Sequence, residues 1–173
     1  SSRMGRAKQD LRLGEGLTMG EAVARALGEV CSSVVSVGTL PLADLPRIED
    51  RRAGHGPLAG IEALLASNLD TQYLICPNDI PRVTPDLLRL LIEETSNDAT
   101  IFERYDVAEV QSLPIRIAAS TLPVLQAALD DGVRAVHRFL EEIDVRVIRL
   151  TNQAGRRLFN VNTPPDYEQV SDD

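Results

Sequence analysis

The chain has 173 residues, of which 43% are hydrophobic and 25% are charged, which suits one globular domain with a core of its own. Its net charge of -8 argues against a protein that binds nucleic acid or an anionic membrane through bulk charge. The sequence contains no apolar run of the roughly 18 residues that a membrane-spanning helix needs, and no secretory signal is visible at its start. We therefore expect a cytoplasmic protein with neither a membrane nor a nucleic-acid partner.

The first part of the chain alternates helical patterns with short apolar runs. A capping box at 18–21 predicts a helix whose apolar residues recur on one face. Short strands are predicted at 33–38 and, more weakly, at 45–49. A helix over 57–67 follows, with proline in its first turn.

The same alternation continues to the carboxyl terminus. A buried strand at 73–76 ends at Pro77, and Thr84 caps a helix that begins with Pro85. The remaining predicted elements are strands at 99–102, 113–117 and 145–150, and helices at 121–129, 132–142 and 164–170. The segment 103–111 has no clear period and is interpreted as a loop. Strands and helices that alternate with short links predict an α/β fold, doubly wound, with a mostly parallel sheet and helices on both faces.

Two cysteines, Cys31 and Cys76, each lie inside an apolar run. They could form a disulfide or a metal pair, but two reduced, buried thiols are the favoured interpretation. The two histidines, His55 and His137, add no spacing typical of a Cys/His metal site.

The amino-terminal residues SSRMGRAK place three cations and two hydroxyls within eight positions. Such a segment suits phosphate groups, because glycine allows close backbone approach while Arg3 and Lys8 neutralise charge. A frayed basic terminus is the alternative. Lys8 is the only lysine of the chain, which makes it a notable candidate for a phosphate site.

A second candidate is Asp79, just beyond the strand at 73–76 and between Pro77 and Pro81. Ligands of open α/β sheets bind at the carboxyl ends of strands, so this carboxylate could hold Mg²⁺ against a nucleotide phosphate. An Asx-turn, in which Asp79 bonds to its own backbone, explains the position equally well.

Two further segments have both a functional and a structural interpretation. The glycine-rich turn at 54–60, with Asp50 upstream, could let the backbone approach a planar base, or could be a plain turn before a helix. In FNVNTPPD, Asn160 and Asn162 could reach a substrate, whereas Thr163 is a suitable N-cap for the helix that follows.

Together, the order and spacing of these stretches resemble the molybdenum cofactor guanylyltransferase (MobA-like) family of Rossmann-like nucleotidyltransferases. The resemblance is carried by SSRMGRAK, GPLAGIEALL, YLICPNDIPRVTPDLL and FNVNTPPDYEQV, and more loosely by QSLPIRIAASTLPVLQAALDDG. It spans essentially the whole chain, and the combination of GPLAGI, P-x-D-x-P and NVNTP is specific. It implies one domain, residues 1–173, with a nucleotide-diphospho-sugar transferase-like fold.

The resemblance also implies an activity, namely Mg²⁺-dependent transfer of GMP from GTP to molybdopterin or molybdenum cofactor, with release of pyrophosphate. Arg3 and Lys8 would neutralise the triphosphate, Asp79 would hold the Mg²⁺, and Asn160 and Asn162 would lie on the pterin side. The residues that would bind the nucleotide are Ser2, Lys8, Asp50, Gly56, Pro57, Leu58 and Asp79. Molybdoenzyme chaperones are further possible partners.

Two departures from the family pattern leave alternatives open. The family signature opens with a strand ending in Leu-x-Gly-Gly, so we expect about ten to fifteen further apolar residues ahead of Ser1, and an open slot beside the strand at 73–76 if they are missing. Ala7 stands where the family commonly has Asp. The alternatives are a catalytically degenerate binding protein of cofactor biogenesis, CMP transfer to the same pterin, or guanylyl transfer to another acceptor. The GPLAGI loop favours GTP.

Overall fold

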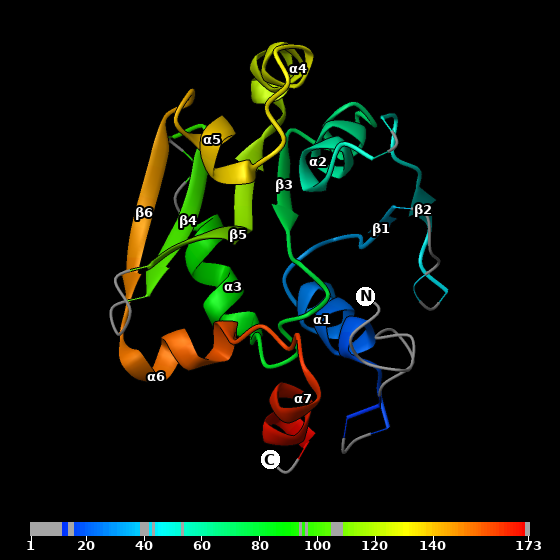
Figure 1. Ribbon diagram of the computed structural model, residues 1–173, viewed down its shortest axis with the longest axis vertical. Coiled ribbons are helices and arrows are strands. Elements are labelled where there is room, and N and C mark those ends of the chain that lie inside the picture. The colour runs from blue at the N-terminus through cyan, green and yellow to red at the C-terminus, as the bar shows by residue number, and fades with distance from the viewer. Residues whose placement is uncertain are drawn as a thin grey trace.

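A four-stranded sheet forms the centre of the molecule, with strand order β3-β5-β4-β6 (Figure 1). The computed structural model describes residues 12–13, 16–38, 42, 44–52, 54–93, 95, 97–104 and 109–171. The strands of this sheet are β3 (Gln72–Ile75), β4 (Ala99–Arg104), β5 (Glu109–Ala118) and β6 (Val145–Leu150). β4 and β6 are parallel, whereas β5 runs antiparallel to both β3 and β4. The predicted α/β class is confirmed, with one reversed strand in an otherwise parallel arrangement.

Two very short strands, β1 (Ser36–Val37) and β2 (Arg47–Ile48), form a separate parallel pair. In the part of the chain that the structure describes, this pair forms no ladder with the four-stranded sheet. It lies beyond β3, on the side of the molecule opposite to β6 (Figure 1).

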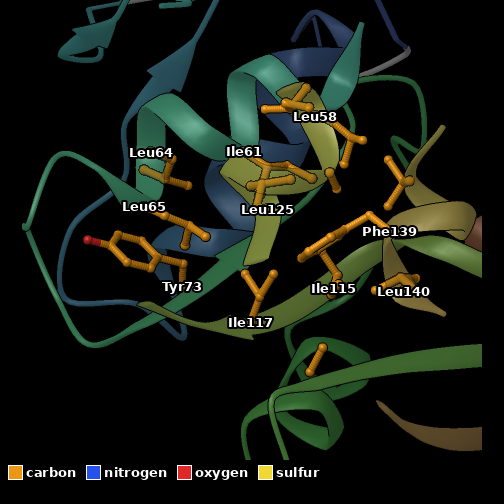
Figure 2. Close-up of a cluster of buried hydrophobic side chains, with 14 of the residues drawn as sticks. Leu58, Ile61, Leu64, Leu65, Tyr73, Ile115, Ile117, Leu125, Phe139 and Leu140 are labelled. Carbon is orange, nitrogen blue, oxygen red and sulfur yellow. The ribbon is translucent and has the colours of Figure 1, made fainter. Parts of the chain in front are cut away.

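Helices cover both faces of the four-stranded sheet. The helices on one face are α2 (Pro57–Leu65), α4 (Leu122–Asp130) and α5 (Val136–Leu140). Their apolar side chains pack on Ile115 and Ile117 of β5, and Figure 2 shows Leu58, Leu125 and Phe139 in this cluster. Each of these five side chains is fully buried.

The opposite face is covered by a second group of helices. These are α1 (Met19–Gly28), α3 (Pro85–Ile92), α6 (Asn152–Gly155) and the 3-10 turn η4 (Arg156–Leu158). Leu88 and Leu91 of α3 pack there against Phe102 of β4, whereas the adjacent Ile101 belongs to the first cluster. Because neighbouring strand residues face opposite sides, one strand supplies both cores.

The helix caps predicted from sequence are confirmed. Glu21 N donates to Thr18 Oγ1 at 3.2 Å, and Thr18 N donates to Glu21 Oε2 at 2.6 Å, which completes the capping box of α1. Leu87 N donates to Thr84 Oγ1 at the start of α3.

The 3-10 turn η3 (Ala119–Thr121) leads into α4, and α7 (Pro164–Ser171) is the predicted terminal helix. No helix within the described ranges is long and apolar enough to cross a membrane.

Three predicted boundaries are wrong. The segment 103–111 is not a loop throughout, because β4 continues to Arg104 and β5 already begins at Glu109. These ends carry charged residues and lack an apolar period, but they pair with each other, Arg104 opposite Glu109. The helix predicted at 132–142 spans only Val136–Leu140, and α6 with η4 occupies a stretch for which no element was predicted.

Candidate active site

A cavity of about 490 Å³ lies where β1, the start of α2 and the turn after β3 meet. Its walls come from α1 and the segment 34–38 on one side, and from Ile75, Cys76, Pro77 and Asn78 on the other. Asp50, Gly56 and Pro57 also line it. Segments that are far apart in the sequence therefore share one open, partly polar space.

Asp50 follows β2 and lies against the first turns of α2. Its Oδ1 is 3.4 Å from the position that a Cβ would take on Gly60. Gly56 is the N-cap of α2, with φ of 70°, a backbone conformation in which a residue with a side chain is strained. The GPLAG sequence thus supplies both a left-handed turn and a helix surface without a side chain beside the Asp50 carboxylate.

The turn after β3 is joined to the carboxyl-terminal segment. Val161 N donates to Asp79 O at 2.8 Å, and the Val161 side chain is fully buried. The flanking Asn160 and Asn162 are exposed. The structure therefore places both asparagines next to the turn after β3 that contains Asp79.

The residues after Asn162 form a reciprocal cap at the start of α7. Asn162 N and Thr163 N both donate to Asp166 Oδ2, at 2.9 and 2.8 Å, and Asp166 N donates to Thr163 Oγ1. This confirms the predicted capping role of Thr163 and fixes the backbone beside both asparagines. Tyr167 OH donates to Arg12 O, which ties α7 to the amino-terminal segment.

Apart from Asn160 and Asn162, the predicted site residues fall into three groups. Asp50, Gly56 and Pro57 line the cavity, and Asn78 brings its neighbour Asp79 to the edge of it. The Leu58 side chain lies instead in the core beneath α2, because it is the first apolar residue of that helix to face the sheet. Ser2, Arg3 and Lys8 lie outside the described residues.

Cys76 is the cysteine that lines the cavity, and its thiol stays neutral. Burial, together with the negative charge of Asp79, raises the pKa of Cys76, and burial raises the pKa of Cys31. Both cysteines are free, which agrees with the predicted reduced thiols, but each is partly exposed rather than buried as predicted. The effect of Asp79 on Cys76, which lines the cavity, also indicates that the carboxylate lies close by.

Two features of the site were not found from sequence. Asn78 lines the cavity, and its position in the predicted ligand turn was the available signal. Arg52, two residues after Asp50, is bound by carboxylates of α2 and α4, and no local pattern indicates such a contact. Among the described residues, no three His, Cys, Asp or Glu side chains form a group that could hold a metal ion by themselves.

Known proteins resemble the chain in both sequence and fold. The family model of the MobA-like NTP transferase domain matches residues 1–147. A probable molybdenum cofactor guanylyltransferase of Carboxydothermus hydrogenoformans is 30% identical over 184 aligned positions, covering 98% of this chain and 89% of the relative. A probable molybdenum cofactor guanylyltransferase of Bacillus cereus is 27% identical, covering 100% of this chain and 92% of the relative.

Solved structures agree on the fold. Molybdopterin-guanine dinucleotide biosynthesis protein A from Archaeoglobus fulgidus superposes with a TM-score of 0.80 at 23% identity, covering 99% of this chain and 92% of that one. A 2-C-methyl-D-erythritol 4-phosphate cytidylyltransferase from Thermus thermophilus gives a TM-score of 0.74 at 18% identity, with 98% and 94% covered. The chain belongs to the MobA-like NTP transferase family of nucleotidyl-transferring enzymes.

Proposed function

We propose that this chain is a molybdenum cofactor guanylyltransferase, which transfers GMP from GTP to the terminal phosphate of molybdopterin. In the reaction an oxygen of the acceptor phosphate attacks the α-phosphorus of GTP, the bond to the bridging oxygen breaks, and pyrophosphate leaves. The observation that carries the proposal is the shared cavity, which brings Asp50 and the start of α2 to the turn that precedes Asp79. Two relatives that align along nearly the whole chain are probable molybdenum cofactor guanylyltransferases, which supports the same activity.

Guanine recognition would fall to Asp50 and the GPLAG turn. A carboxylate can accept from guanine N1–H and from the exocyclic amine, two donors that cytosine and adenine do not present in this pattern. Asp50 lies half-buried at the cavity, which limits competition from water. Gly56 and Gly60 line the same cavity, and neither has a side chain that would occupy the space of the flat base.

The donor set at the turn after β3 fits Mg²⁺. Asp79 and the amide oxygen of Asn78 are hard oxygen donors, and the neighbouring Cys76 thiol stays neutral because its pKa is raised. Asp79 would hold the ion, which when bound offsets charge on the triphosphate. Since the described residues form no complete metal cluster, the remaining ligands would be phosphate oxygens and water.

The other roles follow from position and charge. Ser2, Arg3 and Lys8 would bind the triphosphate, because amides, a hydroxyl and two cations suit its negative oxygens. Asn160 and Asn162, exposed beside Asp79, would contact the pterin acceptor through their amides. We place the reaction in the cytoplasm.

A competition experiment tests the activity. The chain, molybdopterin and equal concentrations of GTP, CTP and ATP are incubated with Mg²⁺, and the dinucleotide products are separated and quantified. We expect the guanine dinucleotide to dominate, and Asp50→Asn to reduce that dominance, since an amide nitrogen cannot accept from guanine donors. Asp86→Asn, at an exposed position on α3, is the matched control. A product dominated by cytosine contradicts the guanylyl assignment and favours cytidylyl transfer.

A further inference from the structure

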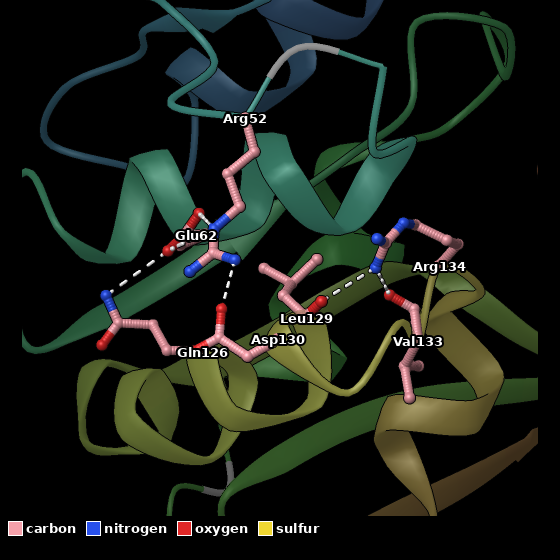
Figure 3. Close-up of polar contacts among 7 residues, drawn as sticks. All are labelled: Arg52, Glu62, Gln126, Leu129, Asp130, Val133 and Arg134. Atoms are coloured by element: carbon pink, nitrogen blue, oxygen red, sulfur yellow. Dashed lines mark hydrogen bonds and ion pairs between the residues drawn. The ribbon is translucent and has the colours of Figure 1, made fainter.

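Arg52 lies two residues after Asp50, and its guanidinium joins two helices. Its Nε donates to Glu62 of α2, at 3.0 Å to Oε2 and 3.3 Å to Oε1. Its Nη1 donates to Asp130 Oδ1 at 2.5 Å, at the last residue of α4 (Figure 3). The Arg52 side chain thus connects the segment that follows Asp50 at the cavity to α2 and α4.

Glu62 is a buried charged residue, which is unusual for the partner of a surface arginine. Glu62 is only 2% exposed. Gln126 Nε2 of α4 supplies another hydrogen bond, 3.4 Å from Glu62 Oε1 (Figure 3). A buried carboxylate is tolerated when its oxygens are hydrogen-bonded, and loss of one partner of such a pair leaves an uncompensated buried charge.

The connection that follows α4 contacts the segment between Asp50 and α2 at a second point. Arg134 O lies 3.5 Å from the position of a Cβ on Gly56, so the backbones approach closely there. The Arg134 guanidinium is occupied with Leu129 O and Val133 O, at 2.9 and 2.8 Å, which holds the α4–α5 connection in place (Figure 3). Arg52 and Gly56 therefore rest on one rigid support, while Asp50 and Gly56 face the cavity.

We propose that Arg52 is a positioning residue for nucleobase selection, acting through Asp50 and Gly56 rather than by touching the nucleotide. The proposal rests on the proposed function. The planar guanidinium reaches Glu62 and Asp130 from separate nitrogens, whereas a lysine ammonium is a single point of charge and cannot hold both carboxylates in the same geometry. A segment anchored at one carboxylate only would let the base-reading groups move while the phosphate and metal side stays as it is.

The test compares Arg52→Lys with wild type in turnover of GTP and CTP, with kcat and KM determined separately. We expect the KM for the preferred nucleotide to rise about tenfold and its preference over the other base to fall about tenfold, with kcat within about twofold. Arg89→Lys, which alters an exposed pair with Asp86 on α3, is the matched control and should change none of these values. Equal preference in wild type and Arg52→Lys, or a loss of kcat alone, overturns the proposal.

A second variant covers the case in which Arg52→Lys unfolds. Asp130→Asn keeps an acceptor for Arg52 Nη1 but removes its charge, and should lower base preference about threefold in the same direction. The double variant, Arg52→Lys with Asp130→Asn, should show the same base preference as Arg52→Lys alone. Both changes act on the contact between Arg52 and Asp130. If the wild-type chain prefers CTP, the guanylyl assignment is wrong but the proposal for Arg52 is still tested. The proposal for Arg52 then depends on whether Arg52→Lys lowers the preference for CTP.

Discussion

The four-stranded sheet and the amino-terminal region around β1 and β2 are built differently. β4 and β5 have six and ten residues and pair along their length, whereas β1 and β2 have two residues each. The sheet carries apolar clusters on both faces, whereas residues 34–38, Leu42, Leu45 and Asp50 line the cavity. The comparison indicates that the two regions have different roles. The sheet stabilises the molecule, and the region beside it presents groups to a ligand.

The boundary between the two regions is open. A cavity of about 270 Å³ lies beside β3, lined by the segment 30–35 on one side and by Tyr73 and Leu74 on the other.

The largest effect is expected at Asp79, the residue proposed to hold Mg²⁺. Asp79→Asn should lower guanylyl transfer roughly 1000-fold, because a bound metal stabilises transition-state charge by several kcal/mol. The midpoint of thermal unfolding should move by less than about 2 °C, since asparagine can also satisfy an Asx-turn. Steady-state kinetics and calorimetry check both. Activity near that of wild type would remove Asp79 from the metal site.

A core truncation measures the contribution of the sheet to stability. Leu125→Ala should lower the free energy of unfolding by about 2–5 kcal/mol, because the side chain is fully buried between α4 and β5. Val37→Ala in β1 should lower it by less than about 1 kcal/mol, since this side chain is 37% exposed. Urea unfolding of both variants gives the comparison. Equal losses would contradict the division of roles.

Helix caps offer a finer comparison of the regions. Thr18→Ala removes part of a two-bond capping box in α1 and should lower the free energy of unfolding by about 1 kcal/mol. Thr84→Ala removes a single cap bond of α3, 3.4 Å long, and should lower it by about 0.5 kcal/mol. Neither should alter kcat. Unfolding curves that rank the two variants in reverse would contradict the role of the reciprocal bond.

The capping box also predicts a pH dependence. Hydrogen bonds from the Thr18 backbone and side chain lower the pKa of Glu21 below its ordinary value of 4.5. A lowered folded-state pKa means that the contribution is fully present above the ordinary value and is lost as the pH falls through the lowered one. Glu21→Gln should therefore flatten the acid side of the stability profile, measured by urea unfolding between about pH 2 and 6.

Much of the fold was predictable because its signals are local. The box at Thr18, the cap at Thr84 and the apolar run of β3 each lie within a few residues and were found. The polar start of β5 was missed because only pairing with β4 makes it a strand. For the site, Asp50 and Gly56 were predicted to act together, whereas Arg52 was not, because its partner Asp130 is 78 positions away.

The smallest effect on stability is expected at Gly60, where α2 contacts both regions. An alanine Cβ would lie 3.2 Å from Val37 Cγ1 and 3.4 Å from Asp50 Oδ1. The gain in helix propensity, about 1 kcal/mol, is offset by the shift that Val37 must make, so the free energy of unfolding should change by less than about 1 kcal/mol. GTP binding should nevertheless weaken about fivefold, because the methyl group fills the surface beside the Asp50 carboxylate against which the base would lie. Gly28→Ala, in open space at the end of α1, is the control and should leave affinity unchanged. If Gly60→Ala binds GTP as tightly as wild type in calorimetry, Asp50 does not read the base.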